Sequence, residues 1–464
     1  MTRAATPPAP ARLAVDGGPP AFAGRTGRAE PKIGVAEFLS IAERFGFKPD
    51  ALARLRAAVT DADLEGEGPN LARFACPFPK ATKTEQFEAL ARQVLGVPYA
   101  RAVSSGTGAL HAAFVAAGVG PGTEVIVPAM GFCATPMAAM LAGGVPVFCD
   151  VDESLQMDPR RVEPCITPRT VAVAPTHHWG GVCDMDPILE IARRRGLKVI
   201  EDCAQGPGGR YRGRPVGSLG DIGCFSISCY KIIGGGEGGL VVTGDARLFE
   251  RLGQVMDGGG LCRPDRFGPE EYVGEVFPGT NYRMSELEAA VDLVQLGKLE
   301  QVVARIRQVS QRVRGRIGTY REVTPQKIND PEGWIGYRLG FFPATVDLGR
   351  RLAAALQKEG IGAHCRGTER HLDWHYYAEM LPVTLRHGHT PGGSVFDDPR
   401  YRPESGWPSY APGTCPVADD LWARGVFVGL DQWWSPEDCD AVAAGIDKVL
   451  AAYCTPDPEA APWT

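Results

Sequence analysis

Two residues that could act together in catalysis follow two apolar runs of the chain. The run 197–200 is typical of a buried parallel strand and leads to Asp202, and the run 222–228 leads to Lys231. In open α/β sheets, ligands bind at the edge where the parallel strands end. The sequence therefore predicts that a carboxylate and an amine face one site at that edge.

An aldehyde cofactor would use this pair of residues. Lys231 can form an imine with an aldehyde, and Asp202 can keep a pyridine nitrogen protonated, which is the arrangement that binds pyridoxal phosphate (PLP). A nearby opposite charge favours the protonated ring, and that ring withdraws electrons from the α-carbon of a substrate. The alternative is a solvated aspartate and a surface lysine on two ordinary loops, so the flanking residues decide between the two interpretations.

The flanking residues resemble the signature of the DegT/DnrJ/EryC1/StrS family of sugar aminotransferases. That family typically shows E-D-x-A-Q, then G-x-x-x-G-x-x-G-D-x-x-x-F-S-F, the lysine and G-E-G-G. The matching residues are Glu201, Asp202, Ala204, Gln205, Gly213, Gly217, Gly220, Asp221, Phe225, Ser226, Lys231 and 236–239. The resemblance implies that Lys231 forms the imine, that Asp202 pairs with the pyridinium, and that Gln205 contacts the ring or its hydroxyl.

A phosphate site is predicted at a turn of small residues. An expected strand over 100–104 is followed by Ser105-Gly106-Thr107-Gly108 and an expected helix over 109–117. A helix N-terminus offers free N–H groups and a positive dipole to an anion, so Gly106 and Thr107 are candidate cofactor-binding residues. An ordinary strand-to-helix turn is the alternative. The segment resembles the family's S-S-G-T-x-A-L-H, and the resemblance adds Ser226 as a hydrogen-bond donor to the phosphate.

Further site residues come from the resemblance. Phe132 matches the family aromatic that stacks on the pyridine ring, and His177 matches a histidine near the cofactor or substrate; core packing is the alternative for each. Tyr230 and Arg283 are candidate substrate residues, and Tyr230 stands where many relatives have Thr or Ser. Asn281, in G-x-N-Y-R-M, would reach the cofactor phosphate of a neighbouring subunit. This implies a homodimer with shared active sites, whereas a helix cap is the alternative. No metal ligands are expected.

The order of the predicted elements indicates the fold. Strands alternate with helices from about residue 99 to 245, which predicts a mainly parallel sheet covered on both faces. The resemblance implies an α/β protein of PLP fold type I, with a mainly parallel, seven-stranded-type sheet flanked by helices and a smaller α+β C-terminal domain. We expect an N-terminal extension with a helix (1–65), a large PLP-binding domain (66–307) and a small C-terminal domain (308–464). The Pro/Gly-rich stretch 386–413 is expected to form a loop over the substrate.

Composition excludes several classes of protein. Of 464 residues, 44% are hydrophobic and 22% charged, which is typical of a globular protein with a large core. The net charge of −6 argues against a nucleic acid or an anionic membrane as a partner. The 13 cysteines are scattered without a C-x-x-C pair, which favours a reducing cytoplasm. We find no signal peptide and no run of about 18 apolar residues, so no membrane span is predicted.

The resemblance implies a PLP-dependent transamination. An amino group would pass from glutamate or glutamine, through pyridoxamine phosphate (PMP), to a keto-sugar (often nucleotide-linked) or a keto-cyclitol, in amino-sugar or aminocyclitol antibiotic biosynthesis. The free amine of Lys231 would move the proton between the donor and the cofactor. A PLP enzyme of other chemistry (a lyase, dehydratase or C–N bond former) is the alternative, because Lys231 and Asp202 serve those reactions too. A non-catalytic role would require a damaged cofactor site.

Overall fold

The structure is a computed structural model of the chain. It describes residues 12–22, 24, 31–65, 68–69, 71, 81–260, 275–388, 390–401 and 406–463. The chain divides into two compact units, the smaller formed by Met1–Leu71 with Ala75–Pro77 and the larger by Ala72–Phe74 with Phe78–Thr464.

The smaller unit contains two helices, α1 (Val35–Arg44) and α2 (Pro49–Ala58), and two 3-10 turns, Ala14–Asp16 and Asp61–Asp63. Our sequence analysis expected a helix in this region, and the structure has two because Gly46 takes a left-handed conformation (φ 73°) between them. Within α1 and α2, Ala42 is the one buried residue. This unit therefore has little core of its own.

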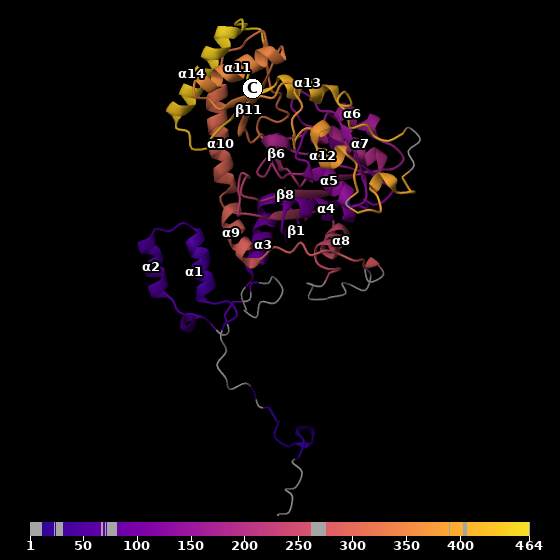
Figure 1. The fold of residues 1–464 in the computed structure, drawn as a ribbon, viewed down its shortest axis with the longest axis vertical. Coiled ribbons are helices and arrows are strands. Elements are labelled where there is room, and N and C mark those ends of the chain that lie inside the picture. Colours follow the sequence, from indigo (N-terminus) through magenta and orange to yellow (C-terminus); the bar gives the residue numbers. More distant parts are fainter. Residues whose placement is uncertain are drawn as a thin grey trace, which may run out of the picture. The chain divides into compact units, whose positions relative to one another are not determined.

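A seven-stranded sheet forms the centre of the larger unit (Figure 1). The strands, in their order across the sheet, are β1 (Tyr99–Val103), β9 (Gly239–Thr243), β8 (Ile222–Ser226), β5 (Lys198–Asp202), β4 (Thr170–Val173), β2 (Glu124–Pro128) and β3 (Val145–Cys149). Strands β3, β2, β4, β5 and β8 pair in parallel, and β9 is antiparallel to both of its neighbours. The predicted α/β fold with a mainly parallel seven-stranded sheet is confirmed.

Helices cover both faces of this sheet because its strands are apolar on both faces. Val125 and Val127 of β2 pack into one core, whereas Ile126 between them packs into the other. The first core includes α4 (Gly106–Ala116), α5 (Ala134–Leu141) and α8 (Ala246–Met256). The second core includes α3 (Lys83–Leu95), α7 (Met185–Arg195), α9 (Glu286–Leu296) and the first half of α10 (Leu299–Arg314). Continuous apolar strands of this kind are expected where a parallel sheet is buried on both sides.

A smaller antiparallel sheet follows in the chain. Its strands, in order, are β10 (Val323–Pro325), β11 (Arg338–Pro343), β13 (Val426–Gly429) and β12 (Ala363–Cys365). The third core lies between this sheet and α10, α11 (Val346–Lys358) and α14 (Pro436–Tyr453). The boundary that we predicted at residues 307 and 308 falls inside α10, which contributes to the second and third cores, so the domain division stays a prediction.

Short elements lie in the connections between strands of the same sheet. These are α6 (Pro159–Val162), β6 (Arg210–Tyr211), β7 (Arg214–Pro215), α12 (Leu381–Thr384), α13 (Pro416–Arg424), and 3-10 turns at Glu163–Cys165, His178–Gly180, Tyr377–Glu379 and Val395–Asp397. No helix of the described residues is both long and apolar enough to span a bilayer.

The stretch 386–413 is anchored rather than free over its described part. Phe396, Tyr401 and Tyr410 are buried. The Tyr401 hydroxyl donates a hydrogen bond to Glu124 Oε1 (2.8 Å) at the start of β2, and the Tyr410 hydroxyl donates one to the Pro146 carbonyl (2.6 Å) in β3. Residues 389 and 402–405 of the predicted loop lie outside the described residues.

Candidate active site

Lys231 lies in a turn that follows β8, and its backbone N–H donates to the carbonyl of Ser228 (3.0 Å). Its side chain reaches a cavity of about 570 Å³. Burial lowers the pKa of Lys231, and the negative charge of Asp202 opposes this shift. The amine and the carboxylate predicted to share a site are therefore close enough to act on each other.

Asp202 is held rigidly at the end of β5. Its side chain is buried, and Oδ2 accepts a hydrogen bond from the hydroxyl of Thr135 in α5 (2.5 Å). Its Oδ1 accepts one from the backbone N–H of Ala204 (3.0 Å). These two bonds fix the orientation of the carboxylate.

Aromatic and amide side chains surround Lys231. The ring of Phe132 lies 5.9 Å from Lys231 Nζ, and 37% of Phe132 is exposed, which leaves a face open to a planar ligand. Gln205 lines the cavity, and its Oε1 accepts a hydrogen bond from the backbone N–H of Trp179 (2.9 Å). This bond orients the Gln205 amide.

The turn of small residues forms an open helix N-terminus beside β8. Ser105 caps α4, because its hydroxyl accepts a hydrogen bond from Gly108 N–H (3.0 Å). A Cβ on Gly106 would lie 2.7 Å from the Cβ of Ser226, so only glycine permits this approach. The first turn of α4 therefore lies against the side chain of Ser226, and a helix N-terminus beside a hydroxyl suits a phosphate.

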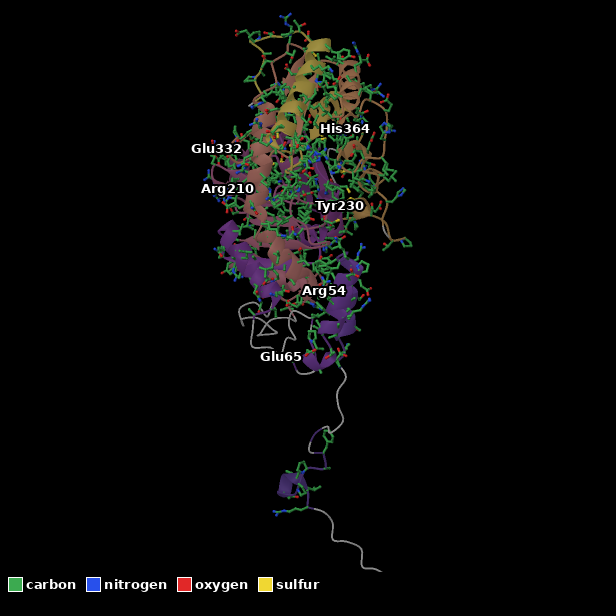
Figure 2. All side chains as sticks on the ribbon, turned by 90° about the vertical axis from the view of Figure 1, so that its left-hand side faces the viewer. Arg54, Glu65, Arg210, Tyr230, Glu332 and His364 are labelled. Atoms are coloured by element: carbon green, nitrogen blue, oxygen red, sulfur yellow. The ribbon has the colours of Figure 1, made fainter. Side chains whose placement is uncertain are left out.

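The cavity also has a wall that the sequence analysis missed. The cavity is lined by Trp179, Ala204, Gln205, Tyr230, Lys231, Ile232, Ile306, Tyr337, Arg338, His375, Gly429, Leu430, Asp431 and Gln432. Tyr230 is 94% exposed and is labelled in Figure 2 on the surface of the larger unit. Arg338, His375 and Asp431 stand far from Lys231 in the chain, and no motif in the sequence marks them.

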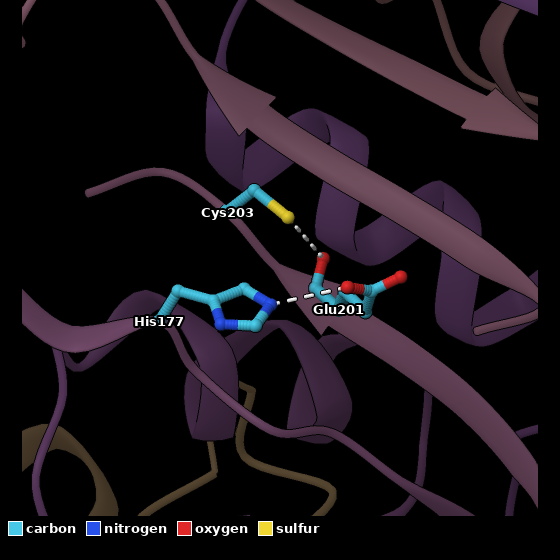
Figure 3. Close-up of side chains that lie close together, drawn as sticks. All are labelled: His177, Glu201 and Cys203. Atoms are coloured by element: carbon cyan, nitrogen blue, oxygen red, sulfur yellow. Dashed lines mark hydrogen bonds and ion pairs between the residues drawn. The ribbon is translucent and has the colours of Figure 1, made fainter. Parts of the chain in front are cut away.

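His177 lies beside Asp202, because its backbone N–H donates to the Asp202 carbonyl (3.0 Å). Its ring is fully buried and does not line the cavity, and its Nε2 lies 3.1 Å from Glu201 Oε2 (Figure 3). The backbone N–H of Cys183 donates to Nδ1 (3.2 Å), so Nε2 carries the proton and donates it to Glu201. The ring thus forms a buried pair with Glu201, and a place of His177 near the cofactor or substrate stays a prediction.

The contacts of Glu201 indicate that the buried pair of His177 and Glu201 has a structural role. Besides His177, the Glu201 carboxylate accepts hydrogen bonds from the backbone N–H groups of Gly217 (2.8 Å), Leu219 (2.7 Å) and Gly220 (2.7 Å). Cys203 lies beside them (Figure 3), and burial raises the pKa of its thiol well above the ordinary value. The oxygens of Glu201 are thus occupied by donors that fasten the end of β5 to the turn before β8.

Asn281 and Arg283 do not line the cavity of their own chain. Asn281 is exposed, and its Oδ1 accepts a hydrogen bond from the backbone N–H of Arg283 (3.2 Å). The Arg283 guanidinium pairs with Asp257 (2.6 Å). The cavity therefore brings together Lys231, Gln205 and Tyr230 of the predicted residues, with Asp202 and Phe132 adjacent to Lys231.

Comparisons with known proteins agree with this geometry. The sequence profile of the DegT/DnrJ/EryC1/StrS aminotransferase family matches residues 78–380. GDP-perosamine synthase of Caulobacter vibrioides is 39% identical over 274 residues, which is 58% of this chain and 70% of that protein.

Solved structures share the fold. That of 3-amino-5-hydroxybenzoic acid (AHBA) synthase matches with a TM-score of 0.63 and 27% identity, covering 80% of this chain and 91% of that one. NtdA of Bacillus subtilis, solved with the bound cofactor PMP, matches with a TM-score of 0.63 and 25% identity, covering 80% of this chain and 78% of that one. With the profile match spanning both Asp202 and Lys231, the chain belongs to the DegT/DnrJ/EryC1/StrS family of PLP-dependent aminotransferases.

Proposed function

We propose that this chain transfers an amino group from glutamate or glutamine to the keto group of a sugar, with PLP held at Lys231. One observation carries the proposal: the Lys231 amine faces a cavity of about 570 Å³ while the buried Asp202 carboxylate acts on its pKa. The likeness to GDP-perosamine synthase supports a nucleotide-linked sugar as the acceptor. A keto-cyclitol is a second acceptor to test.

Residues of β5, β8, α4, the turns next to them and the segment before α5 would hold the cofactor. Lys231 would attach to it, Asp202 would pair with its ring nitrogen, and Phe132 would stack on the ring. Gln205 would contact the ring or its hydroxyl. The phosphate would be held by Gly106, Thr107 and Ser226, whose cradle has room because Gly106 lacks a Cβ.

The lowered pKa of Lys231 suits a proton carrier. Burial favours the neutral amine. A larger fraction of the Lys231 amine can therefore take a proton from the α-carbon of the amino donor and return it. PLP, when bound, supplies a ring that draws the electron pair left on that carbon. Asp202, whose orientation is fixed by Thr135 and Ala204, would stabilise a protonated ring nitrogen through its negative charge.

We also propose that the enzyme is a homodimer with shared active sites. Asn281 is exposed and does not line the cavity of its own chain. A second copy could therefore receive the Asn281 amide at its cofactor phosphate. Tyr230, which is almost fully exposed and lines the cavity, would meet the acceptor. Arg283, which does not line the cavity of its own chain, would meet the acceptor of the second copy.

The test is a product assay with defined substrates. The PLP-loaded protein is incubated with L-glutamate or L-glutamine and with nucleotide-linked keto-sugars or keto-cyclitols, and amino products are identified by mass spectrometry. We expect one acceptor class to yield an amino product with a matching amount of keto acid, and Lys231→Ala to yield none. Release of ammonia or water from the substrate without amino transfer would contradict the proposal.

A further inference from the structure

The guanidinium of Arg338 has no role in the function proposed above. Arg338 begins β11 and lines the cavity that Lys231 lines. Its Cζ lies 3.8 Å from the ring centroid of Trp179, which also lines the cavity. Stacking on an indole holds a guanidinium in one plane and leaves its edge free to bind.

Trp179 is itself rigid. Its backbone has φ 52° and ψ 37°, a left-handed conformation that is rare for a bulky residue and marks a position fixed by its surroundings. The amide of Gln205 holds its N–H, and Trp422 and Phe427 pack against its ring. The stack therefore presents Arg338 at a fixed position.

The described residues offer Arg338 no counter-ion. None of the ion pairs among the described residues includes Arg338. By contrast, Arg366, which directly follows β12, pairs with Glu379. Burial lowers the pKa of Arg338. A half-buried guanidinium without an acid partner is costly unless an anion binds it.

The imidazoles near Arg338 add no positive charge to the cavity near pH 7. Burial lowers the pKa of His178, His364 and His375, and the charge of Arg338 lowers each of them further. These rings are therefore neutral near pH 7, and the cations that line the cavity are Lys231 and Arg338, with Asp431 as an acid on the same wall. An anionic ligand fits this charge distribution.

The position of Arg338 indicates which anion. The charges of both Lys231 and Arg338 lower the pKa of His375, so both cations lie near one ring. In an amino acid the α-carboxylate is bonded to the carbon that carries the reacting amine, and so it must lie close to Lys231. In a nucleotide-linked keto-sugar, the phosphates are separated from the keto carbon by several bonds.

We propose that Arg338, held by Trp179, binds the α-carboxylate of the amino donor through paired hydrogen bonds. This inference rests on the proposed function, because it names the residue that selects the donor at the same site. A planar guanidinium fits a carboxylate with two parallel N–H···O bonds. Asp431 would then face the uncharged or cationic part of a ligand.

The experiment measures the donor half-reaction alone. The PLP-loaded wild-type protein, Arg338→Gln and Arg338→Lys are titrated with L-glutamate while the absorption of the bound cofactor is followed. Arg314→Gln is the matched control, because Arg314 also stacks on a tryptophan, Trp334 (4.7 Å), but does not line the cavity. Retained cofactor absorption before titration shows that each variant is folded.

We expect Arg338→Gln to raise the half-saturating concentration of L-glutamate by about 10- to 100-fold, the usual effect of a charge-assisted hydrogen bond. Arg338→Lys should lie between this variant and the wild type, and Arg314→Gln should match the wild type. An unchanged titration in Arg338→Gln would overturn the proposal.

A pair of isomeric donors tests the α-carboxylate itself. L-glutamine carries a free α-carboxylate, whereas L-isoglutamine carries an amide there. The wild-type protein should prefer L-glutamine, and Arg338→Gln should lose most of that preference. A wild-type protein that converts both donors equally would contradict the proposal. An effect of Arg338→Gln that is confined to the KM of the keto-sugar would also contradict it, because Arg338 would then bind a phosphate of the acceptor. A wild-type protein that responds to no amino donor would instead refute the proposed function.

Discussion

The reactivity of the site depends on how single residues control the charge of Lys231. Burial lowers the pKa of its amine, and the carboxylate of Asp202 opposes that shift from a position fixed by two hydrogen bonds. Burial therefore favours the neutral, nucleophilic form of the Lys231 amine, and the two hydrogen bonds keep the Asp202 carboxylate in one orientation. Removing the Lys231 amine or the Asp202 carboxylate should therefore impair the chemical step more than it impairs ligand binding.

Asp202→Asn should lower the pKa of Lys231 further, because the opposing negative charge is lost. In the cofactor-free protein, labelling of Lys231 by an amine-acylating reagent should therefore reach its half-maximum at a lower pH than in the wild type. With PLP bound, we expect turnover to fall by roughly 10²- to 10³-fold. An unchanged labelling profile would show that the two groups do not interact.

Asp292 should make stability depend on pH. It lies in α9, neither of its carboxylate oxygens has a hydrogen-bond partner among the described residues, and burial with the nearby charge of Glu288 raises its pKa to about 8. The unfolded chain loses this proton at about pH 4. The folded protein therefore loses stability as the pH rises from about 4 to 8, and the loss is complete above pH 8.

Asp292→Asn removes this dependence. We expect the free energy of unfolding of the variant relative to the wild type to increase between pH 5 and 8, on the order of a few kcal/mol in total. Chemical denaturation at several pH values measures the slope. Asp347→Asn, at an exposed residue of α11, is the control, and equal slopes in the wild type and Asp292→Asn would contradict the account.

At the scale of elements, the site forms at one edge of the sheet, where two strands end and one helix begins. Asp202 closes β5, Ser226 closes β8, and Gly106 opens α4. The contact between Gly106 and Ser226 sets how closely α4 approaches β8, because a Cβ there would lie 2.7 Å from that of Ser226. The width of the phosphate cradle is thus set by one missing methyl group.

Gly106→Ala should push α4 away from β8 and weaken cofactor binding. We expect the dissociation constant of PLP to rise about 10-fold or more, since a loss of about 1.4 kcal/mol is tenfold. Gly120→Ala is the control, because nothing lies within 4 Å of the added Cβ there. Equal PLP affinities in the two variants, measured by equilibrium dialysis, would show that the cradle does not hold the phosphate.

The elements also explain what the sequence could predict. Apolar runs identify β5 and β8, and the polar residues that follow them identify Asp202 and Lys231. The opposite wall could not be predicted in this way, since Arg338 and residues 429–432 reach the cavity only through the pairing of β11 with β13 in the smaller sheet. A strand end also does not reveal which way a side chain turns, and the ring of His177 bonds to the buried Glu201.

At the scale of the whole molecule, the larger unit combines a parallel and an antiparallel sheet, and the cavity has walls from both. Lys231 follows β8 of the first, and Arg338 begins β11 of the second. The proposed dimer would add Asn281 of a second copy. This arrangement makes complementation between inactive variants possible.

Lys231→Ala and Asn281→Ala should each be inactive alone but partly active together. In a mixed two-fold dimer, one site would receive Lys231 from one subunit and Asn281 from the other. Random mixing should therefore restore about a quarter of the wild-type activity. Activity of the mixture that equals the sum of the separate variants would contradict shared active sites.

The attachment of PLP to Lys231, and its release by an amino donor, is the central claim. Its most direct test is borohydride reduction of the PLP-loaded protein before and after addition of L-glutamate or L-glutamine, followed by peptide mass spectrometry. We predict that reduction without donor fixes the cofactor on Lys231, and that prior addition of the donor prevents this labelling. Labelling of another lysine, or labelling of Lys231 that neither donor diminishes, would contradict the claim.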